Sequence, residues 1–315
     1  MKSLSIIIPC FNEAKNIATF YTTMMGERWR EMVGEYEMIF IDDGSTDATI
    51  DEIKKLQKSD KNICLIKFSR NFGKESAMFA GLKVAQKSLV TIMDCDLQDP
   101  PNLLSEMLKI YNANLDSNGR GRVQMIVAKR TNRSGEGKIR AFFSEIFYKI
   151  NNALSSVKII SGVRDFRLME REVVESILTM NEYHRFSKAI FEFVGFKKRY
   201  LEYEYIPRES GESKWNFIKL LRYGLGGIIS FSITPLRAIT IIGIVIFALS
   251  GAWGSYILLK ALIFGDPVKG YPSLMVLISF LGGLQIIMLG IIGEYIGRIY
   301  EQGKGRPHYI IEYES

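Results

Sequence analysis

The sequence predicts an α/β fold with a doubly wound, mostly parallel sheet, followed by interfacial helices and two C-terminal transmembrane helices. In residues 1–100, short apolar runs alternate with polar, helix-like stretches. A spacing of about 30 residues between such runs is the pattern of parallel strands joined by helical crossovers. Residues 238–259 and 270–293 contain no charged residue, and each run exceeds the roughly 20 apolar residues that cross a bilayer.

Each apolar run in the first part of the chain ends in a polar loop, and a helix-like stretch follows. The four loops are PCFNE, DDGSTD, SRNFGK and DCDLQD. Because the carboxyl ends of parallel strands share one edge of the sheet, where ligands bind, we expect the four loops to form one site. The predicted strands span 4–8, 36–41, 63–68 and 89–93, and the predicted helices span about 12–33, 45–58 and 75–85.

The last of these loops lies in VTIMDCDLQDPP, residues 90–101. Side chains alternate along an extended chain, so Asp94, Asp96 and Gln98 can converge. Magnesium or manganese prefers one or two carboxylates together with substrate phosphates, so the pattern indicates a site for a metal-bound diphosphate. The alternative is a solvated turn in which Asp99 and Pro100 start a helix.

Composition restricts the possible partners. The net charge is +7 and the isoelectric point is about 9.1, which suits nucleic acid, a membrane surface or an anionic substrate. The hydropathy favours the membrane, and we expect no nucleic-acid partner. The sequence lacks G-x-G-x-x-G and the P-loop motif, and its three scattered cysteines and two histidines give no zinc spacing. The cysteines resemble reduced cytosolic thiols.

The charges around the two apolar runs predict the membrane topology. Arg222 and Arg237 precede the first run, and three basic residues follow the second, which places both termini in the cytoplasm of a multi-pass inner-membrane protein. Two buried core helices are the alternative. Glycines in the second run favour packing into a homo-oligomer, of which a tetramer is one form. The predicted parts are a cytoplasmic domain (1–215), amphipathic juxtamembrane helices (216–236), two spans (237–263 and 271–297) and a cytoplasmic tail (298–315).

Taken in order, the four loops resemble those of the family 2 glycosyltransferases of GT-A fold. The whole chain, including the two spans, is similar to the bacterial polyisoprenyl-phosphate glycosyltransferases related to dolichol-phosphate mannose synthase, a class that includes the bactoprenol glucosyltransferases. The resemblance implies a metal site, for Mg²⁺ or Mn²⁺, at Asp94, Asp96 and Gln98. It implies that the donor is bound by Pro9, Asn12, Glu13, Asp42, Arg70, Lys74 and Asp94. For Asn12 and Glu13, helix capping is the alternative.

Two later segments resemble further parts of the family's site. GVRDFRLM matches the segment with the presumed catalytic aspartate, here Asp165, with Arg167 close by and Asp96 counted with them as catalytic. A structural Asp165–Arg167 ion pair is the alternative. PRESGESKW resembles a loop that closes over the diphosphate, for which a solvated linker is the alternative. Its candidate residues are Arg208, Ser210, Ser213 and Lys214.

The resemblance implies a specific reaction. The protein is expected to transfer one sugar from a UDP-sugar, UDP-glucose or a related hexose donor, to undecaprenyl phosphate, with inversion. The lipid phosphate is mostly dianionic at neutral pH, so it needs little help from a base. A processive polysaccharide synthase would need more spans and a Q-x-x-R-W motif, and neither is present. A non-enzymatic membrane scaffold is the remaining alternative.

Overall fold

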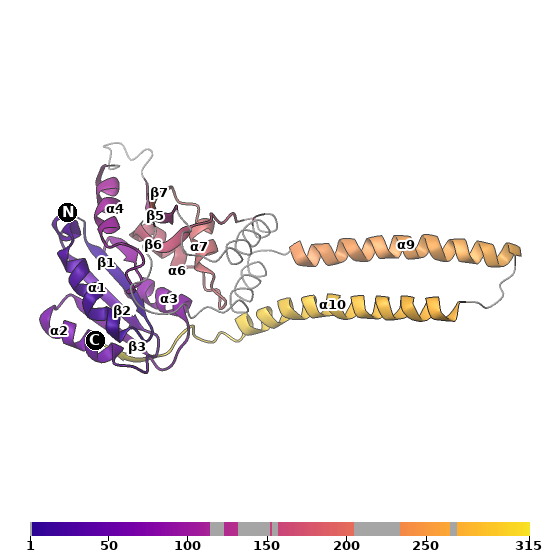
Figure 1. Ribbon diagram of the computed structural model, residues 1–315, viewed down its shortest axis with the longest axis horizontal. Coiled ribbons are helices and arrows are strands. Elements are labelled where there is room, and N and C mark those ends of the chain that lie inside the picture. The colour runs from indigo at the N-terminus through magenta and orange to yellow at the C-terminus, as the bar shows by residue number, and fades with distance from the viewer. Residues whose placement is uncertain (1, 114–122, 132–151, 153–156, 205–233, 265–269) are drawn as a thin grey trace.

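The computed structural model describes residues 2–113, 123–131, 152, 157–204, 234–264 and 270–315 (Figure 1). An α/β body holds the N-terminal elements, and two long helices run side by side away from it. The elements of the first part are β1 (Leu4–Cys10), α1 (Ala14–Gly26), the 3-10 helix η1 (Arg28–Met32), β2 (Tyr36–Asp42), α2 (Thr49–Ser59), β3 (Ile63–Phe68), α3 (Lys74–Val84), β4 (Leu89–Ile92) and α4 (Asn102–Ala113). These bounds confirm the predicted strand and helix order up to residue 100.

The second part of the body contributes strands that the sequence showed less clearly. Its elements are β5 (Met125–Arg130), β6 (Val163–Glu170), α6 (Arg171–Leu178), α7 (Ser187–Phe193), β7 (Lys198–Tyr203), α9 (Thr234–Phe264), α10 (Tyr271–Gly303) and β8 (Ile311–Glu314). The predicted loop over the diphosphate, PRESGESKW, lies outside the described residues, and so do the predicted juxtamembrane helices except for residues 234–236.

The sheet has eight strands in the order β7-β5-β6-β4-β1-β2-β3-β8. Strand β1 pairs in parallel with β2 and β4, and β2 pairs in parallel with β3. Strand β6 is antiparallel to both β4 and β5, and β8 is antiparallel to β3. The sheet is therefore mixed around a parallel centre, and the predicted α/β class is confirmed.

Both faces of the sheet are buried, which explains why its central strands are apolar throughout. Ile6 and Ile8 of β1 pack into the core under α1 and α4, whereas Ile7 packs into the core under α3. This division follows from the alternation of side chains along a strand. The first core also contains Phe20 and Trp29, both fully buried. The sheet thus has helices on each face and leaves its carboxyl edge for the loops.

Helix α3 lies close to β1 because Gly81 carries no side chain. A β-carbon on Gly81 would lie 2.2 Å from Cγ2 of Ile7. This close approach sets the distance between α3 and the sheet. It therefore also positions Lys74, the first residue of α3.

Two long C-terminal helices contain the apolar runs, apart from Gly270, and extend beyond them. Helix α9 has 31 residues and α10 has 33, which is about 46 to 50 Å at 1.5 Å per residue. Within the described residues, one segment, Phe280–Gly303 of α10, meets the length and composition of a membrane span. Its apolar side chains face outward, with Ile286 72% and Ile299 70% exposed.

Residues of the predicted tail at 298–315 pair with the sheet. After α10 the chain returns to the body, where β8 completes the sheet beside β3 (Figure 1). Leu65 and Ser315 exchange two backbone hydrogen bonds of 2.9 and 3.0 Å, and the ring of Tyr309 stacks on Phe68 with centroids 4.8 Å apart. The base of the helical hairpin is therefore bound to the same sheet that carries the loops.

We predict that Gly81→Ala destabilises the α/β body by about 1 to 3 kcal/mol, because the new methyl group overlaps Ile7 in a packed core. Gly26→Ala is the matched control, since a β-carbon there meets nothing within 4 Å in the described structure, and its effect should stay within about 0.5 kcal/mol. Thermal unfolding of the purified protein in detergent measures both. Equal effects of the two substitutions would contradict the close packing of α3 on β1.

Candidate functional site

The first two loops at the carboxyl edge are joined through Asn12. Its backbone N–H donates to Oγ of Ser45 at 2.9 Å, and its Oδ1 accepts the N–H of Thr46 at 2.8 Å. Asn12 has a φ of +56°, a left-handed conformation that Asn tolerates better than most residues. The side chain therefore caps the second loop, and not α1, and its predicted contact with the donor stays a prediction.

The second and third loops are joined through Asp43, which is almost fully buried. Its carboxylate accepts the N–H groups of Phe72 at 2.6 Å and Gly73 at 2.9 Å. Gly44, at φ +70°, allows the loops to touch, because a β-carbon there would lie 2.4 Å from the carbonyl carbon of Arg70. Asp43 thus shapes the loop that leads into Lys74.

Asp42 presents a buried acceptor at this edge. Its Oδ2 accepts the N–H of Ser45 at 3.0 Å, whereas its Oδ1 has no hydrogen-bond partner among the described residues. Burial raises the pKa of Asp42. Buried polar atoms are almost always paired, so an unpaired oxygen beside a ligand edge indicates a place for a ligand donor. Pro9 lies on β1, next to Ile41 in the sheet register, and Glu13 accepts Nδ2 of Asn16 at 2.5 Å.

Lys74 occupies the centre of the site. Its Nζ lies 2.7 Å from Asp94 Oδ1 and 2.9 Å from Asp165 Oδ2. The three residues come from the start of α3, from the loop after β4 and from β6. The structure therefore brings together three residues that are far apart in the sequence and that were predicted as site residues from separate motifs.

The charges at this centre keep one another ionised. Burial opposes the charged form of Asp165, but Lys74, Lys188 and Arg167 outweigh it, so the pKa of Asp165 lies well below its ordinary value. Burial likewise opposes the charged form of Lys74, but Asp165 and Asp94 outweigh it and raise the pKa of Lys74. A carboxylate with so low a pKa is a weak proton acceptor, which favours a positioning role for Asp165.

Arg167 contacts the backbone of Asp165. It is 1% exposed, and it donates to the backbone carbonyls of Asp165 at 3.1 Å and Arg164 at 2.6 Å. Its guanidinium lies 3.5 Å from the ring centroid of Phe191. These contacts hold the backbone of β6, and a catalytic role for Arg167 stays a prediction.

The loop after β4 holds the predicted metal ligands. In the described part of the chain, no three His, Cys, Asp or Glu side chains form a ready-made metal cluster. Asp94, Asp96 and the amide of Gln98 are nevertheless hard oxygen donors, and Mg²⁺ or Mn²⁺ needs only one or two carboxylates when phosphate supplies the other ligands. These residues therefore fit a cation that arrives with a diphosphate.

The remaining predicted residues divide into two groups. Arg70 lies at the edge, where its Nη1 donates to the carbonyl of Asn71 at 2.9 Å and its guanidinium lies 4.0 Å from the ring centroid of Phe72. Its predicted contact with the diphosphate or sugar stays a prediction. The second group lies outside the described residues and comprises Arg208, Ser210, Ser213 and Lys214.

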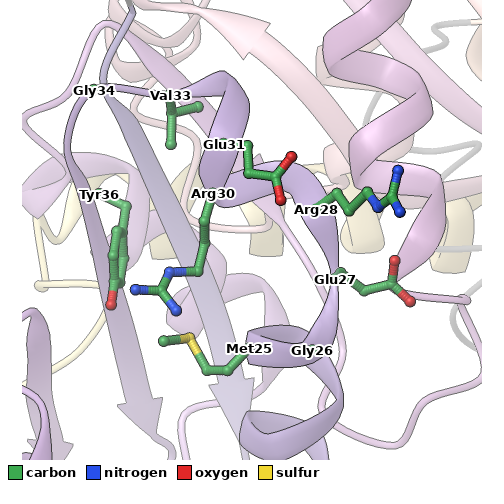
Figure 2. Close-up of a pocket in the computed structure, with 9 residues that line it drawn as sticks. All are labelled: Met25, Gly26, Glu27, Arg28, Arg30, Glu31, Val33, Gly34 and Tyr36. Atoms are coloured by element: carbon green, nitrogen blue, oxygen red, sulfur yellow. The ribbon is translucent and has the colours of Figure 1, made fainter.

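A surface hollow of about 460 Å³ lies elsewhere in the body, around η1 (Figure 2). Arg30 lies beside the ring of Tyr36 there, 5.6 Å from its centroid. Tyr36 is the first residue of β2 and Asp42 is its last, so the hollow lies at the opposite edge of the sheet from the loops. It takes no part in the candidate site.

Comparisons with known proteins match the α/β body and the helical hairpin separately. The family model described as glycosyl transferase family 2 matches residues 5–178, and the model described as GtrB C-terminal hairpin matches residues 234–299. The bactoprenol glucosyl transferase of Shigella phage SfV is 44% identical over 99% of this chain and 99% of its own. A prophage-derived bactoprenol glucosyl transferase of Shigella flexneri is 44% identical over 98% and 97%.

Among solved structures, the mannosyltransferase PcManGT from Pyrobaculum calidifontis, in complex with GDP-Man and Mn²⁺, is 15% identical with a TM-score of 0.42. The match covers 91% of this chain and 86% of that one. At this score the likeness supports no conclusion about ligands.

We predict that the stability contributed by Asp43 depends on pH. Burial raises the pKa of Asp43 from 3.8 to about 6, so the folded state resists ionisation of this carboxyl, and its contribution to stability falls as the pH rises from about 4 to about 6. The difference between the two pKa values corresponds to at most about 3 kcal/mol.

The measurement compares wild type with Asp43→Asn, whose amide does not titrate, by thermal unfolding in detergent between pH 4 and 7. The stability of wild type relative to Asp43→Asn should decrease across this range. A difference that stays constant with pH would show that burial does not perturb Asp43.

Proposed function

Because the chain belongs to glycosyl transferase family 2 and is a glycosyltransferase, we propose that it transfers one sugar from a UDP-sugar, with inversion and with a divalent cation, to a polyisoprenyl phosphate at the cytoplasmic face of the membrane. The observation that carries the proposal is the meeting of Lys74, Asp94 and Asp165 at the carboxyl edge of the sheet. The names of the relatives, bactoprenol glucosyl transferases, support the choice of lipid carrier and of glucose. We infer a GT-A fold on the same grounds.

The nucleoside is proposed to bind at the end of β1 and β2. Oδ1 of Asp42 is a buried acceptor that lacks a partner among the described residues, and uracil carries an N3–H donor of matching chemistry. A hydrogen bond from a ligand would satisfy this oxygen, whose isolation otherwise costs about 1 to 3 kcal/mol. Asn12 and Asp43 would keep the surrounding loops in place.

The diphosphate is proposed to lie over Lys74 and the loop after β4. Asp94, Asp96 and Gln98 would hold Mg²⁺ or Mn²⁺, which when bound would offset the charge that develops on the departing UDP. Lys74 is already at this position, and its ammonium can meet phosphate oxygens in place of a carboxylate. Arg70, at the same edge, would add a second positive charge.

In the proposed reaction, an oxygen of the lipid phosphate attacks the anomeric carbon as the bond from that carbon to UDP breaks. The attacking group is already ionised at neutral pH, so no proton has to be removed. This agrees with Asp165, which the neighbouring cations keep ionised and weakly basic. Asp165 would instead fix Lys74 and orient the sugar, a role that depends on its position and not on its pKa.

A lipid acceptor would explain why the α/β body is joined to a helical hairpin. The acceptor stays in the bilayer, and the outward-facing apolar side chains of α10 suit contact with lipid. We propose that α9 and α10 are two spans with both termini in the cytoplasm. Along α10, a β-carbon on Gly282, Gly283 or Gly290 would meet nothing within 4 Å in the described structure, which leaves room for a neighbouring copy in a homo-oligomer.

A panel of radiolabelled UDP-sugars, incubated with the purified protein and undecaprenyl phosphate, tests the activity. Label should enter the organic phase with one donor, stop on chelation with EDTA and return on addition of Mn²⁺ or Mg²⁺. Asp96→Asn should lower this transfer in the same way. Transfer that persists with EDTA or with Asp96→Asn would contradict the metal assignment, and nuclear magnetic resonance of the product reports the anomeric configuration.

We predict that Asp165→Asn lowers the transfer rate by about 100-fold, because Lys74 and the sugar lose a fixed partner, while UDP binding changes little. Glu52→Gln is the matched control, since it removes a carboxylate that pairs with a lysine, Lys55, on the surface of α2. It should leave the rate unchanged. A similar loss of UDP affinity and rate in Asp165→Asn would indicate damage to the nucleotide site.

A further inference from the structure

The turn that carries the predicted metal ligands has a strained backbone. Leu97, between Asp96 and Gln98, has a φ of +56°, a left-handed conformation that is unfavourable for a residue with a branched apolar side chain. Such a conformation persists only where surrounding contacts enforce it. Within the turn, Oδ1 of Asp96 accepts the N–H of Gln98 at 3.2 Å.

The contacts that hold the turn come from two distant strands. Asp99, 2% exposed, accepts hydrogen bonds from the hydroxyl of Tyr203, the last residue of β7, and from Nε of Arg164 on β6 at 3.3 Å. Nη2 of Arg164 also donates to Oε1 of Gln98 at 3.2 Å. One guanidinium and one phenol thus attach two consecutive residues of the loop to the sheet.

These contacts distinguish Asp99 from a helix cap. Helix α4 begins at Asn102, yet both interactions of the Asp99 carboxylate reach strands that lie elsewhere in the sequence. Burial of a carboxylate is unfavourable unless it is hydrogen-bonded, so the phenol and the guanidinium fix where Asp99 lies. With Asp99 fixed immediately after Gln98, the turn has little freedom to relax.

We propose that Asp99, Arg164 and Tyr203 are positioning residues that hold the turn of residues 94–98 in its strained shape and thereby set its affinity for a divalent cation. The inference rests on the proposed function for the identity of the ligand, but the strained turn and its contacts stand without it. The three residues act through Asp96 and Gln98. Partners behind metal ligands commonly change metal affinity by about 10- to 100-fold.

Strand β7 offers a matched pair of substitutions. Tyr203→Phe removes the hydroxyl that donates to Asp99. Tyr200→Phe removes a hydroxyl from the same strand that is buried and has no partner in the described part of the chain. Both variants lose one oxygen from a tyrosine, so a general effect on β7 would be common to the two.

The first experiment measures Mn²⁺ binding to the full-length protein in detergent with saturating UDP, by electron paramagnetic resonance. Tyr203→Phe should weaken Mn²⁺ binding about tenfold, and Tyr200→Phe should leave it as in wild type. In the Leu97→Gly background, where the left-handed turn no longer needs enforcing, Tyr203→Phe should weaken binding less than threefold. Equal Mn²⁺ affinity for Tyr203→Phe and Tyr200→Phe would overturn the inference.

The second experiment separates this inference from the proposed function, because it needs no metal or nucleotide. Amide hydrogen exchange in a peptide that covers residues 93–101 should be about tenfold faster in Tyr203→Phe than in Tyr200→Phe. Unchanged exchange would overturn the inference even if wild type binds Mn²⁺. Faster exchange in a protein that binds no Mn²⁺ would support the positioning role and refute the metal site of the proposed function.

Discussion

One ammonium group between two carboxylates determines the arrangement of the carboxyl edge of the sheet. Lys74 Nζ lies within 3 Å of both Asp94 and Asp165, and without it the two carboxylates would face each other with like charge. Their attraction to Lys74 ties α3, the loop after β4 and strand β6 to one point. The same balance suits the proposed anionic donor. Phosphate oxygens could replace the carboxylates beside Lys74, and a cation could replace Lys74 beside the carboxylates, so no buried charge would lose its partner.

The loops around this centre owe their shape to buried polar contacts and to close backbone approach. Asn12 holds the second loop, Asp43 holds the third, and Gly44 lets the two touch. Each contact satisfies backbone groups that a tight loop would otherwise leave unpaired. The edge is therefore largely formed before a ligand arrives, and Oδ1 of Asp42 is left without a partner in the described part of the chain.

The return of the chain after α10 has a mechanical consequence. Strand β8 and Tyr309 fasten the end of the hairpin to β3, and at the end of α10 the side chain of Gln302 accepts the N–H of Tyr183 at 2.7 Å. The hairpin is thus joined to the body at its C-terminal end by a strand and a side chain as well as by the continuous chain. If the hairpin spans the bilayer and the carboxyl edge of the sheet binds the substrates, as we propose, these contacts limit how far that edge can tilt away from a lipid phosphate.

The sequence by itself determined the elements: the strands of residues 1–100, the polar loops that end them and the long uncharged helices. These features follow from patterns within one strand or one turn, which local side-chain spacing encodes. The resemblance to the family 2 glycosyltransferases added Asp42, Lys74, Asp94 and Asp165 as candidate site residues, and their roles stay predictions. The tertiary structure alone decided that β6 runs antiparallel beside β4, that β8 closes the sheet, that Arg167 is buried, and that Tyr203 meets Asp99. Each of these depends on a partner distant in the chain, and burial and pairing between distant segments leave no local pattern from which they could be predicted.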